Sequence, residues 1–331
     1  MPRADARAAP RPAAPALPDS MHVIERDWLS SNQVLFFDGA GAEARASLVD
    51  TGYVKHAELT LALVRHVLAR RGLPERALTR VLNTHLHSDH CGGNAALARE
   101  FGCRVLVPAA ELDAVARWDE EALTYASTGQ RCERFTADGT LHAGERLELG
   151  GAQWEVLAAP GHDPHSLMLY CAEHRGLVSA DALWENGFGV IFPEVYGDSG
   201  FAEQQAVLEL IATLDVDWVV PGHGRVFGDV PAALERAFAR LKALRGHPSR
   251  NARNALKVLL KFQMLDRERV ELPVLYDALR GARFIENAAG LMHMSVPDAL
   301  DWAIRELVKQ SQLARDGDTL LNHEPSGAAS A

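Results

Sequence analysis

The chain has 331 residues, of which 47% are hydrophobic and 24% charged, and its formal net charge is -10. This length and apolar fraction allow a sizeable buried core, which excludes a disordered or low-complexity protein. The acidic balance and the pI near 5.8 argue against a surface built as a whole to bind nucleic acid or anionic membranes. Every apolar run is shorter than the roughly 20 residues of a membrane-spanning helix, so we expect a soluble protein.

The first twenty residues are rich in Ala, Pro and Arg and contain no continuous apolar stretch of the kind that a signal peptide needs. We predict a disordered leader over residues 1–20, with Met21 as a candidate start. The cysteines show no paired spacing, and a chain of this size needs no disulfides to fold: Cys91, Cys103, Cys132 and Cys171. We therefore expect a reducing, cytoplasmic compartment.

Short runs of β-forming residues recur along the first two thirds of the chain, and each ends near Gly, Pro, Asp or Asn. We predict strands at residues 33–37, 47–50, 80–83, 104–107, 153–157, 166–170, 176–179 and 217–220. Helical periodicity lies between them, for example at residues 58–71, where Gly72 and Pro74 close the pattern. Clustered strands with interspersed helices predict an α/β fold with two sheets sandwiched between helical layers.

The pattern changes after about Arg245, where Gly246-His247-Pro248 interrupts the chain. Helical patterns follow at residues 252–265, 273–280 and 298–313, and two short apolar arms flank an Asp-Gly turn at residues 312–321. We predict a catalytic domain over residues 21–245 and a small helical, winged-helix-like domain over residues 246–331.

The run Thr84-His85-Leu86-His87-Ser88-Asp89-His90 contains four side chains able to bind metal, and they span only six residues. His85 and His87 lie two residues apart directly after a predicted strand, so both imidazoles can face one point. Asp89 and His90 follow where the chain turns toward a helix. Neutral imidazoles suit zinc or iron, and a carboxylate adds a hard oxygen ligand. A single His is usually a surface or core residue, but this clustering predicts a metal site that can serve two ions.

The segment His85-x-His87-x-Asp89-His90 resembles the HxHxDH signature of the metallo-β-lactamase superfamily, and Leu48-Val49-Asp50-Thr51-Gly52 resembles its early strand motif. The remaining motifs of the family follow in order: Pro160-Gly161-His162, Ser179-Ala180-Asp181 and Pro221-Gly222-His223-Gly224. The resemblance covers roughly residues 22–235. It implies the four-layer αβ/βα sandwich of that superfamily, with the metal site at one edge.

Carried over position by position, the resemblance implies two metal ions and seven ligands. It assigns His85, His87 and His162 to the first metal, Asp89, His90 and His223 to the second, and Asp181 to the bridge. Two Zn²⁺ are the expected cofactors, with iron or manganese as alternatives, and Asp89 and Asp181 are the expected catalytic carboxylates. Asp50 is expected to accept the N–H of a ligand imidazole, with capping of a strand end as the alternative.

Two cations bridged by a carboxylate lower the pKa of a bound water, so a bridging hydroxide can attack a carbonyl or phosphorus near neutral pH. Asp181 at the bridge resembles glyoxalase II-like thioesterases, lactonases and phosphodiesterases more than β-lactamases, and His87 stands where the flavodiiron pattern has Glu. The leading hypothesis is a metallo-hydrolase that cleaves a thioester or similar activated acyl bond. Its expected partner is a small acyl substrate, for which an anionic coenzyme A thioester is one candidate.

Other interpretations stay open. A persulfide dioxygenase would use a single iron bound by the residues at His85, His162 and Asp181. Between Leu241 and Arg283 there are ten Lys or Arg and four Asp or Glu. This basic excess can bind an anionic substrate or nucleic acid, which would fit an RNA- or DNA-cleaving phosphodiesterase or a ligand-sensing regulator. More often, such a segment is a solvated helix face. No membrane partner is expected, and the sequence leaves the oligomeric state open.

Several side chains near the motifs have less certain roles. The aromatic residues that follow Asp181 are candidate walls of a substrate pocket, with core packing as the alternative: Trp184, Phe188, Phe192 and Tyr196. Cys91 is expected to pack toward the helix and not to bind metal. His165 is expected to lie in a solvated loop, with substrate contact as the alternative.

Overall fold

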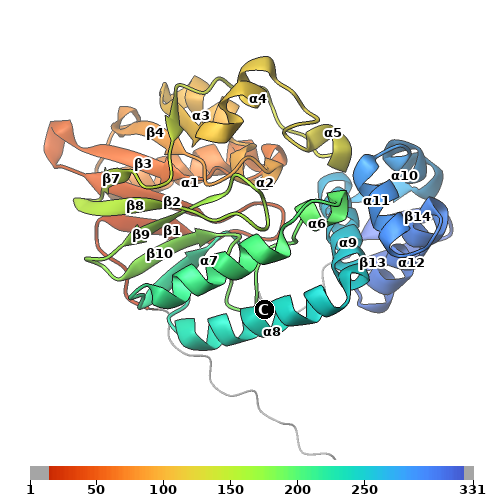
Figure 1. Ribbon diagram of the computed structural model, residues 1–331. Helices are drawn as coiled ribbons and strands as arrows, with labels where there is room; N and C mark the ends of the chain where they lie inside the picture. The colour runs from red at the N-terminus through yellow and green to blue at the C-terminus, as the bar shows by residue number, and fades with distance from the viewer. Residues whose placement is uncertain (1–14, 324–331) are drawn as a thin grey trace, which may run out of the picture.

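The computed structural model describes residues 15–323, and the remainder of the predicted leader, residues 1–14, lies outside them. Two sheets lie face to face between layers of helices, and further helices close one end of the sandwich (Figure 1). Within the described range no helix is both long and apolar enough to cross a membrane. Residues 15–20 precede the first strand, and Leu17 packs against the core between the sheets.

The first sheet has six strands in the order of the chain. They are β1 (Met21–Ile24), β2 (Gln33–Asp38), β3 (Arg45–Val49), β4 (Leu78–Leu82), β5 (Arg104–Pro108) and β6 (Gly139–Leu141). The first three pair antiparallel, and β3 to β6 pair parallel. Parallel pairing needs crossover connections, and helices supply them between β3, β4 and β5.

The second sheet has five strands in the order β11-β10-β9-β8-β7. They are β7 (Arg146–Leu149), β8 (Ala152–Ala158), β9 (Leu167–Cys171), β10 (Gly176–Ala180) and β11 (Trp218–Pro221). All neighbours pair antiparallel except β10 and β11, which are parallel and are joined through a helix. The eight predicted strands are therefore all present, and β1, β6 and β7 are additional.

Helices cover the outer face of each sheet. On the first sheet lie α1 (Ala57–Arg70), α3 (Asn94–Phe101) and α4 (Leu112–Arg117), and on the second lie α7 (Phe201–Thr213) and α8 (Val230–Gly246) (Figure 1). Three short helices lie in the connections: α2 (Ser88–Cys91), α5 (Tyr125–Thr128) and α6 (Pro193–Tyr196). Four single-turn 3₁₀ segments lie at residues 41–43, 54–56, 75–77 and 109–111.

Adjacent residues of the central strands serve different cores. Leu48 faces the helices over the first sheet, whereas Val49 faces the second sheet; Val219 and Val220 divide in the same way on the other side. Successive strand residues point to opposite faces, and both faces are covered here, so these strands are continuously apolar and not alternating. The four-layer α/β sandwich expected from the sequence is thereby confirmed.

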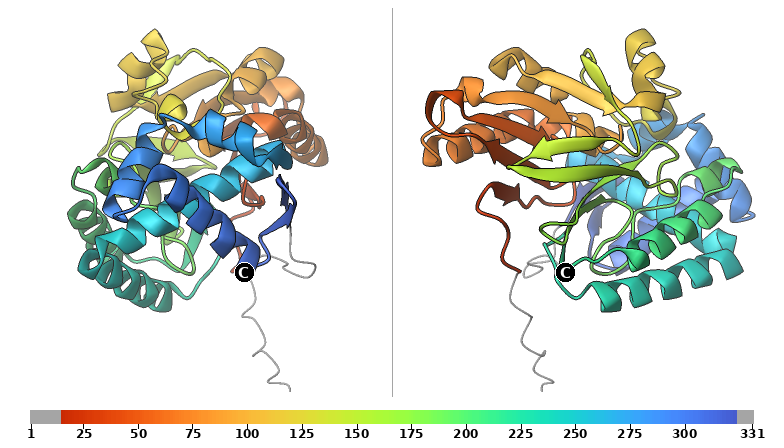
Figure 2. Two further views of the ribbon diagram at one scale, coloured as in Figure 1. Left: turned by 90° about the vertical axis from the view of Figure 1, so that its right-hand side faces the viewer. Right: turned by 60° about the vertical axis from the view of Figure 1, so that its left-hand side comes forward.

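The C-terminal region begins where the sequence breaks, since α8 ends at Gly246 and the next helix starts at Pro248. It comprises α9 (Pro248–Arg267), β12 (Arg269–Glu271), α10 (Leu272–Leu279), α11 (Arg283–Leu291), α12 (Val296–Lys309), β13 (Leu313–Asp316) and β14 (Thr319–Asn322). Three helices and a hairpin were expected. The structure adds α11, whose buried residues are Phe284, Ile285, Ala288 and Ala289, and β12, a three-residue strand that pairs with β14. These helices stack against one end of the sandwich (Figure 2).

Candidate metal centre

Five strand ends of the two sheets meet at one edge of the sandwich and carry the sequence motifs there. β3 leads into Asp50, and β4 leads into a short loop that holds His85 and His87, followed by α2, which holds Asp89 and His90. In the second sheet, β8, β10 and β11 lead into His162, Asp181 and His223. The ends of both sheets thus bring together predicted ligands that are up to 138 positions apart in the chain, from His85 to His223.

All seven predicted ligands lie in this one place, and they form three overlapping groups, each with donor atoms within 4.8 Å of one another; the group of His85, His90 and Asp181 connects the other two. We call His85, His87 and His162 the first cluster, and Asp89, His90 and His223 the second cluster. Asp181 lies between them: its Oδ2 is 3.3 Å from His162 Nε2, and its Oδ1 is 3.5 Å from His90 Nε2. Six of the seven residues are buried, and Asp89 is partly exposed.

The imidazoles of the first cluster point their ring nitrogens at one another. His87 Nδ1 lies 3.1 Å from His85 Nε2 and 2.8 Å from His162 Nε2. Burial lowers the pKa of His162 to about 4 and lowers the pKa of His85 well below its usual value. The rings of His85 and His162 are therefore neutral near pH 7, and three ring nitrogens converge on one point. A cation fits this arrangement of donors.

The second cluster is surrounded by carboxylates. Burial disfavours a charged His90, but Asp50 and Asp181 outweigh burial and raise the pKa of His90 well above its usual value. Burial likewise opposes ionisation of Asp89, yet the hydrogen bond with His223 Nε2, 3.0 Å away, lowers the pKa of Asp89 to about 2. His90 Nε2 and His223 Nδ1 are buried without hydrogen-bond partners. Negative charge and an unpartnered His90 nitrogen beside Asp181 also suit a bound cation.

Asp50 lies where the sequence predicts, behind a ligand imidazole. Its Oδ2 accepts a hydrogen bond from His90 Nδ1 at 2.8 Å, and its Oδ1 accepts one from the Thr84 backbone N–H at 2.9 Å. This contact leaves His90 Nε2 as the nitrogen that faces Asp181. In the first cluster, His162 Nδ1 donates to the carbonyl of Val190 at 2.5 Å. Such contacts fix the tautomer and ring orientation of metal ligands.

Two glycines lie so close to the clusters that no side chain would fit. A Cβ on Gly222 would lie 2.1 Å from Asp181 Oδ1 and 2.9 Å from His90 Cε1. A Cβ on Gly189 would lie 2.4 Å from His162 Nδ1. Gly222 belongs to the quoted Pro-Gly-His-Gly motif, whereas Gly189 lies in the loop after Asp181. Both are needed for the close approach of backbone to the ligands.

Sequence reasoning missed two residues at the site. Asp163 is buried, and its Oδ2 lies 3.7 Å from His87 Nε2. Trp28, in the β1–β2 loop, lies over His223 with ring centroids 5.9 Å apart. Asp163 directly follows the Pro160-Gly161-His162 motif, which was the available signal. For Trp28 the sequence carries no signal, because it precedes the first quoted motif by twenty residues.

The predicted aromatic residues divide between the site and the core. Trp184 and Phe192 contact ligand rings: Trp184 lies edge-on to His223, and Phe192 lies 5.0 Å from the ring centroid of His87. Phe188 is fully buried in the core under α7 and α8. Tyr196 packs against Phe284 of α11 and is hydrogen-bonded to Ser127.

Cys91 and His165 lie outside the two clusters. The Cys91 thiol is buried beside the hydroxyl of Tyr125, 3.1 Å away, and belongs to neither cluster. His165 is exposed in a loop, with its Nε2 4.0 Å from Glu111 Oε1. Burial raises the pKa of Glu111 to about 8, with Asp163 as a second contribution.

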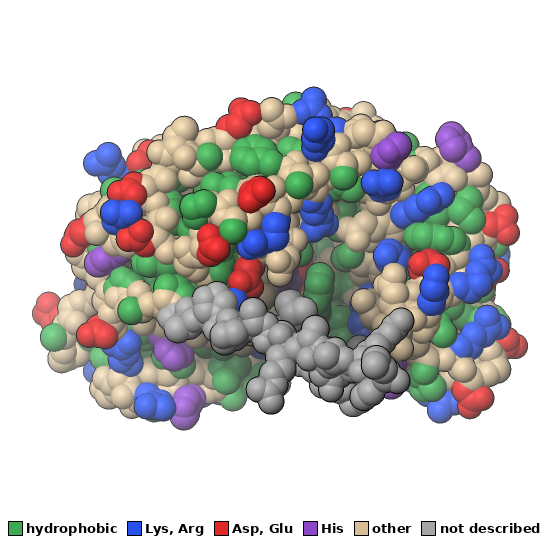
Figure 3. Space-filling view, turned by 90° about the horizontal axis from the view of Figure 1, so that it is seen from below, with side chains coloured by type: hydrophobic (Ala, Val, Ile, Leu, Met, Phe, Trp, Pro, Cys, Tyr) green, Lys and Arg blue, Asp and Glu red, His purple; other side chains and the backbone are tan. Residues whose placement is uncertain are grey.

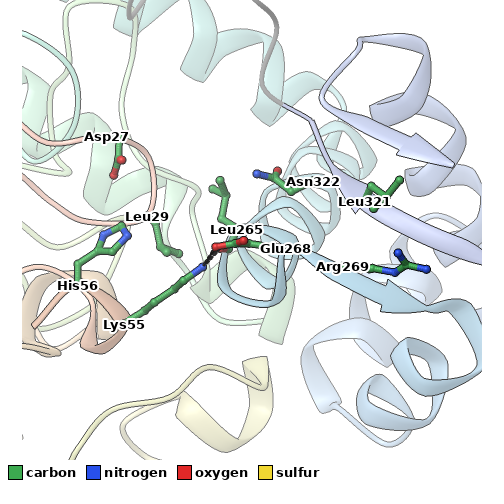
Figure 4. Close-up of a pocket in the computed structure, with 9 residues that line it drawn as sticks. All are labelled: Asp27, Leu29, Lys55, His56, Leu265, Glu268, Arg269, Leu321 and Asn322. Carbon is green, nitrogen blue, oxygen red and sulfur yellow. Dashed lines mark hydrogen bonds and ion pairs between the residues drawn. The ribbon is translucent and has the colours of Figure 1, made fainter.

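A cavity of about 470 Å³ lies next to the Trp28 loop, between the sandwich and the C-terminal region (Figure 4). Asp27 and Leu29 line one side of it, and residues of β12 and β14 line the other. Lys55 bridges it through an ion pair with Glu268 at 2.6 Å.

Figure 3 shows the underside of the molecule, where acidic and basic side chains are interspersed and Lys and Arg are more numerous on the right.

The sequence profile of the metallo-beta-lactamase superfamily matches residues 26–223, more than half of the chain. The chain belongs to this superfamily. A hydroxyacylglutathione hydrolase of Rhodopseudomonas palustris is 31% identical over 157 residues, covering 47% of this chain and 52% of the relative. An acyl-coenzyme A thioesterase, MBLAC2 of Bos taurus, is 28% identical over 225 residues, covering 62% and 78%. The chain therefore spans about half of the first relative's length, and both relatives are named as hydrolysing enzymes.

Solved structures of the superfamily share the fold at low identity. A metallo-beta-lactamase family protein of Thermus thermophilus has a TM-score of 0.56 and 22% identity, covering 93% of this chain and all of that one. A beta-lactamase domain protein of Burkholderia ambifaria has a TM-score of 0.55 and 18% identity, with 94% coverage of each chain. Coverage of this extent includes C-terminal helices as well as the sandwich. The superfamily and its relatives imply a divalent metal ion, and the two clusters supply candidate ligands.

Proposed function

We propose that this superfamily member is a hydrolase that cleaves a thioester or a similarly activated acyl bond, with two zinc ions held at the metal centre. The observation that carries the proposal is the meeting of two complete donor clusters around one carboxylate, Asp181. The names of the relatives support the substrate class, because hydroxyacylglutathione and acyl-coenzyme A are both thioesters. On this proposal the seven ligands are the predicted ones, with Asp181 as the bridge.

When bound, a pair of zinc ions supplies a nucleophilic water of lowered pKa and polarises the carbonyl oxygen of the substrate. The chain contributes position and charge. Asp181 faces both clusters, which sets their separation, while Asp50 orients His90 and Val190 orients His162. Phe192 covers His87 and His162, so it limits access of bulk water to the first cluster.

The second cluster supports a two-metal enzyme over a one-iron dioxygenase. A single iron at His85, His162 and Asp181 would leave Asp89 and His223 without a metal to bind, and both are packed into the same buried edge. His90 Nε2 would also stay close to Asp181 without a hydrogen bond. Unpartnered buried nitrogen atoms are unfavourable, so their retention supports a second ion.

The experiment is a substrate screen of the purified protein after loading with zinc. Thioester, lactone, phosphodiester and β-lactam substrates are compared at equal concentration, and bound metal is counted by elemental analysis. The proposal expects about two zinc ions per chain and the largest kcat/KM for a thioester. One iron per chain with oxygen uptake would overturn it, as would phosphodiester cleavage coupled to salt-dependent nucleic-acid binding.

The proposal also includes the cellular compartment and the domain boundary. All four cysteines are free thiols, which supports a reducing, cytoplasmic compartment. The helix break at His247 supports a catalytic domain over residues 21–245 and a C-terminal domain over residues 246–331.

A further inference from the structure

Trp28 exposes a large apolar surface directly beside the second cluster. Its side chain is 57% exposed, and its ring is stacked on that of His223 with an interplanar angle of 19°. Trp184 completes the group, because it lies edge-on to Trp28 at 6.0 Å and to His223 at 5.5 Å between ring centroids. Two indoles therefore flank a candidate metal ligand, and one of them faces solvent.

The β1–β2 loop that carries Trp28 is fastened to the loops of the metal centre. Ser31 N donates to the carbonyl of Asp89 at 2.9 Å, and Asn32 N donates to the carbonyl of Gly222 at 2.7 Å. The Asn32 side-chain amide donates to the carbonyls of Pro221 and Gly224 as well. Because this loop is tied to both the Asp89 and the His223 segments, the indole is held in place at the edge of the site.

Trp184 is fixed from the other side. Its Nε1 donates to Asp181 Oδ1 at 3.2 Å, and its backbone N–H donates to the carbonyl of Gly187 at 2.7 Å. Glu185, the next residue, forms a two-pronged ion pair with Arg225 at 2.6 and 2.9 Å. The N–H edge of the Trp184 indole thus faces Asp181, so the carbon atoms of the ring can contact apolar groups.

We propose that Trp28 and Trp184 form an acyl-binding wall that selects substrates with an extended aliphatic acyl group. The inference rests on the proposed thioester hydrolysis. A thioester carbonyl at Asp181 and the two clusters has this wall beside it, and the apolar indoles suit an aliphatic acyl chain better than a polar thiol such as glutathione or coenzyme A. Covering the exposed face of Trp28 with an alkyl chain removes apolar surface of both partners from water, which favours longer chains.

The first test compares acetyl and octanoyl thioesters of the same thiol. In Trp28→Ala, the ratio of KM for the octanoyl thioester to KM for the acetyl thioester should rise by roughly 10-fold or more. Trp28→Phe should restore most of the preference, because an aromatic face remains. Leu210→Ala, an exposed apolar change on α7, is the matched control. Equal changes for both substrates, or none, would overturn the wall.

A second measurement separates this inference from the proposed function. Calorimetry with octanoate and acetate compares ligands that share a carboxylate and differ only in the alkyl chain. The wild-type protein should bind octanoate at least about 10-fold more tightly, and Trp28→Ala should lose that difference. If no thioester is cleaved but octanoate binds more tightly in this way, the acyl-binding wall is supported and the proposed function is wrong. If thioesters are cleaved but octanoate and acetate bind equally, the wall is wrong and the function stands.

Discussion

The two clusters of the metal centre use different physical means to present their donors. The first consists of three imidazoles; burial lowers the pKa of His85 and His162, and the Val190 carbonyl orients the His162 ring. The second is embedded in negative charge from Asp50, Asp89 and Asp181, strong enough to raise the pKa of the buried His90. We infer that convergence of lone pairs dominates ion binding in the first cluster and that charge dominates it in the second.

Removal of Asp181 should break both halves of this comparison, because its carboxylate lies within 4 Å of imidazole nitrogens of both clusters. Asp181→Ala is expected to lower kcat/KM by roughly 1000-fold or more and to leave at most one ion per chain. Steady-state kinetics with elemental analysis checks this. Full activity with both ions retained would show that the bridging assignment is wrong.

Single methyl groups should separate the clusters. Gly189→Ala places a Cβ against His162 and should impair the first cluster, whereas Gly222→Ala places one against Asp181 and His90 and should impair the second. Each should lose one ion and about 1–3 kcal/mol of stability. Gly290→Ala, in α11 with no atom within 4 Å of an added Cβ, is the control and should stabilise the chain or leave it unchanged. Metal content and denaturant unfolding report both effects.

The role of charge is sharpened by Asp50→Asn, which keeps an acceptor for His90 Nδ1 but removes the negative charge. Zinc affinity of the second cluster should fall by about 10–100-fold, while that of the first stays within about 3-fold. Titration with a competing chelator resolves the two affinities. An equal loss at both would contradict the distinction. Asp215→Asn, an exposed change on the surface, should alter neither.

Metal removal should lower the thermal stability of the fold, because bound ions offset the charge of the second cluster. Zinc at 100 times its Kd stabilises the folded state by about 2.7 kcal/mol per site, so chelation should lower Tm by several degrees. Asp181→Ala should show a smaller zinc-dependent rise in Tm than the wild type. Thermal unfolding with and without chelator measures it, and a Tm independent of zinc would argue against either cluster as a metal site.

The smallest effect is expected at a contact between the sandwich and α9 that involves none of the predicted ligands. The Tyr53 hydroxyl donates to Asp266 Oδ2 at 3.2 Å and accepts from the Arg131 backbone N–H. Tyr53→Phe should cost about 0.5–1.5 kcal/mol of unfolding free energy without changing metal content. Loss of either ion in this variant would mean that the C-terminal region helps to shape the clusters.

Strands and ligands were predictable from sequence because each depends on local pattern. The β-type runs mark buried strands, and the four motifs place every donor at a strand end, so the edge of the sandwich follows from them. Trp28 was not predictable, because its position depends on hydrogen bonds between its loop and segments 60 to 190 residues away. The short α11 was missed although its buried residues Phe284, Ile285, Ala288 and Ala289 recur on one helical face; the helix has only nine residues and Gly290 lies within it.

The loop between β10 and α6, together with α6, connects the metal centre to the C-terminal helices. Val190 and Val195 belong to the hydrophobic core of the C-terminal helices, and Phe192 lies between His87 and Phe284 of α11. The backbone carbonyl that orients His162 comes from the same Val190. The two regions are therefore not independent modules. Exchange of the C-terminal helices between relatives would require this loop to be exchanged with them.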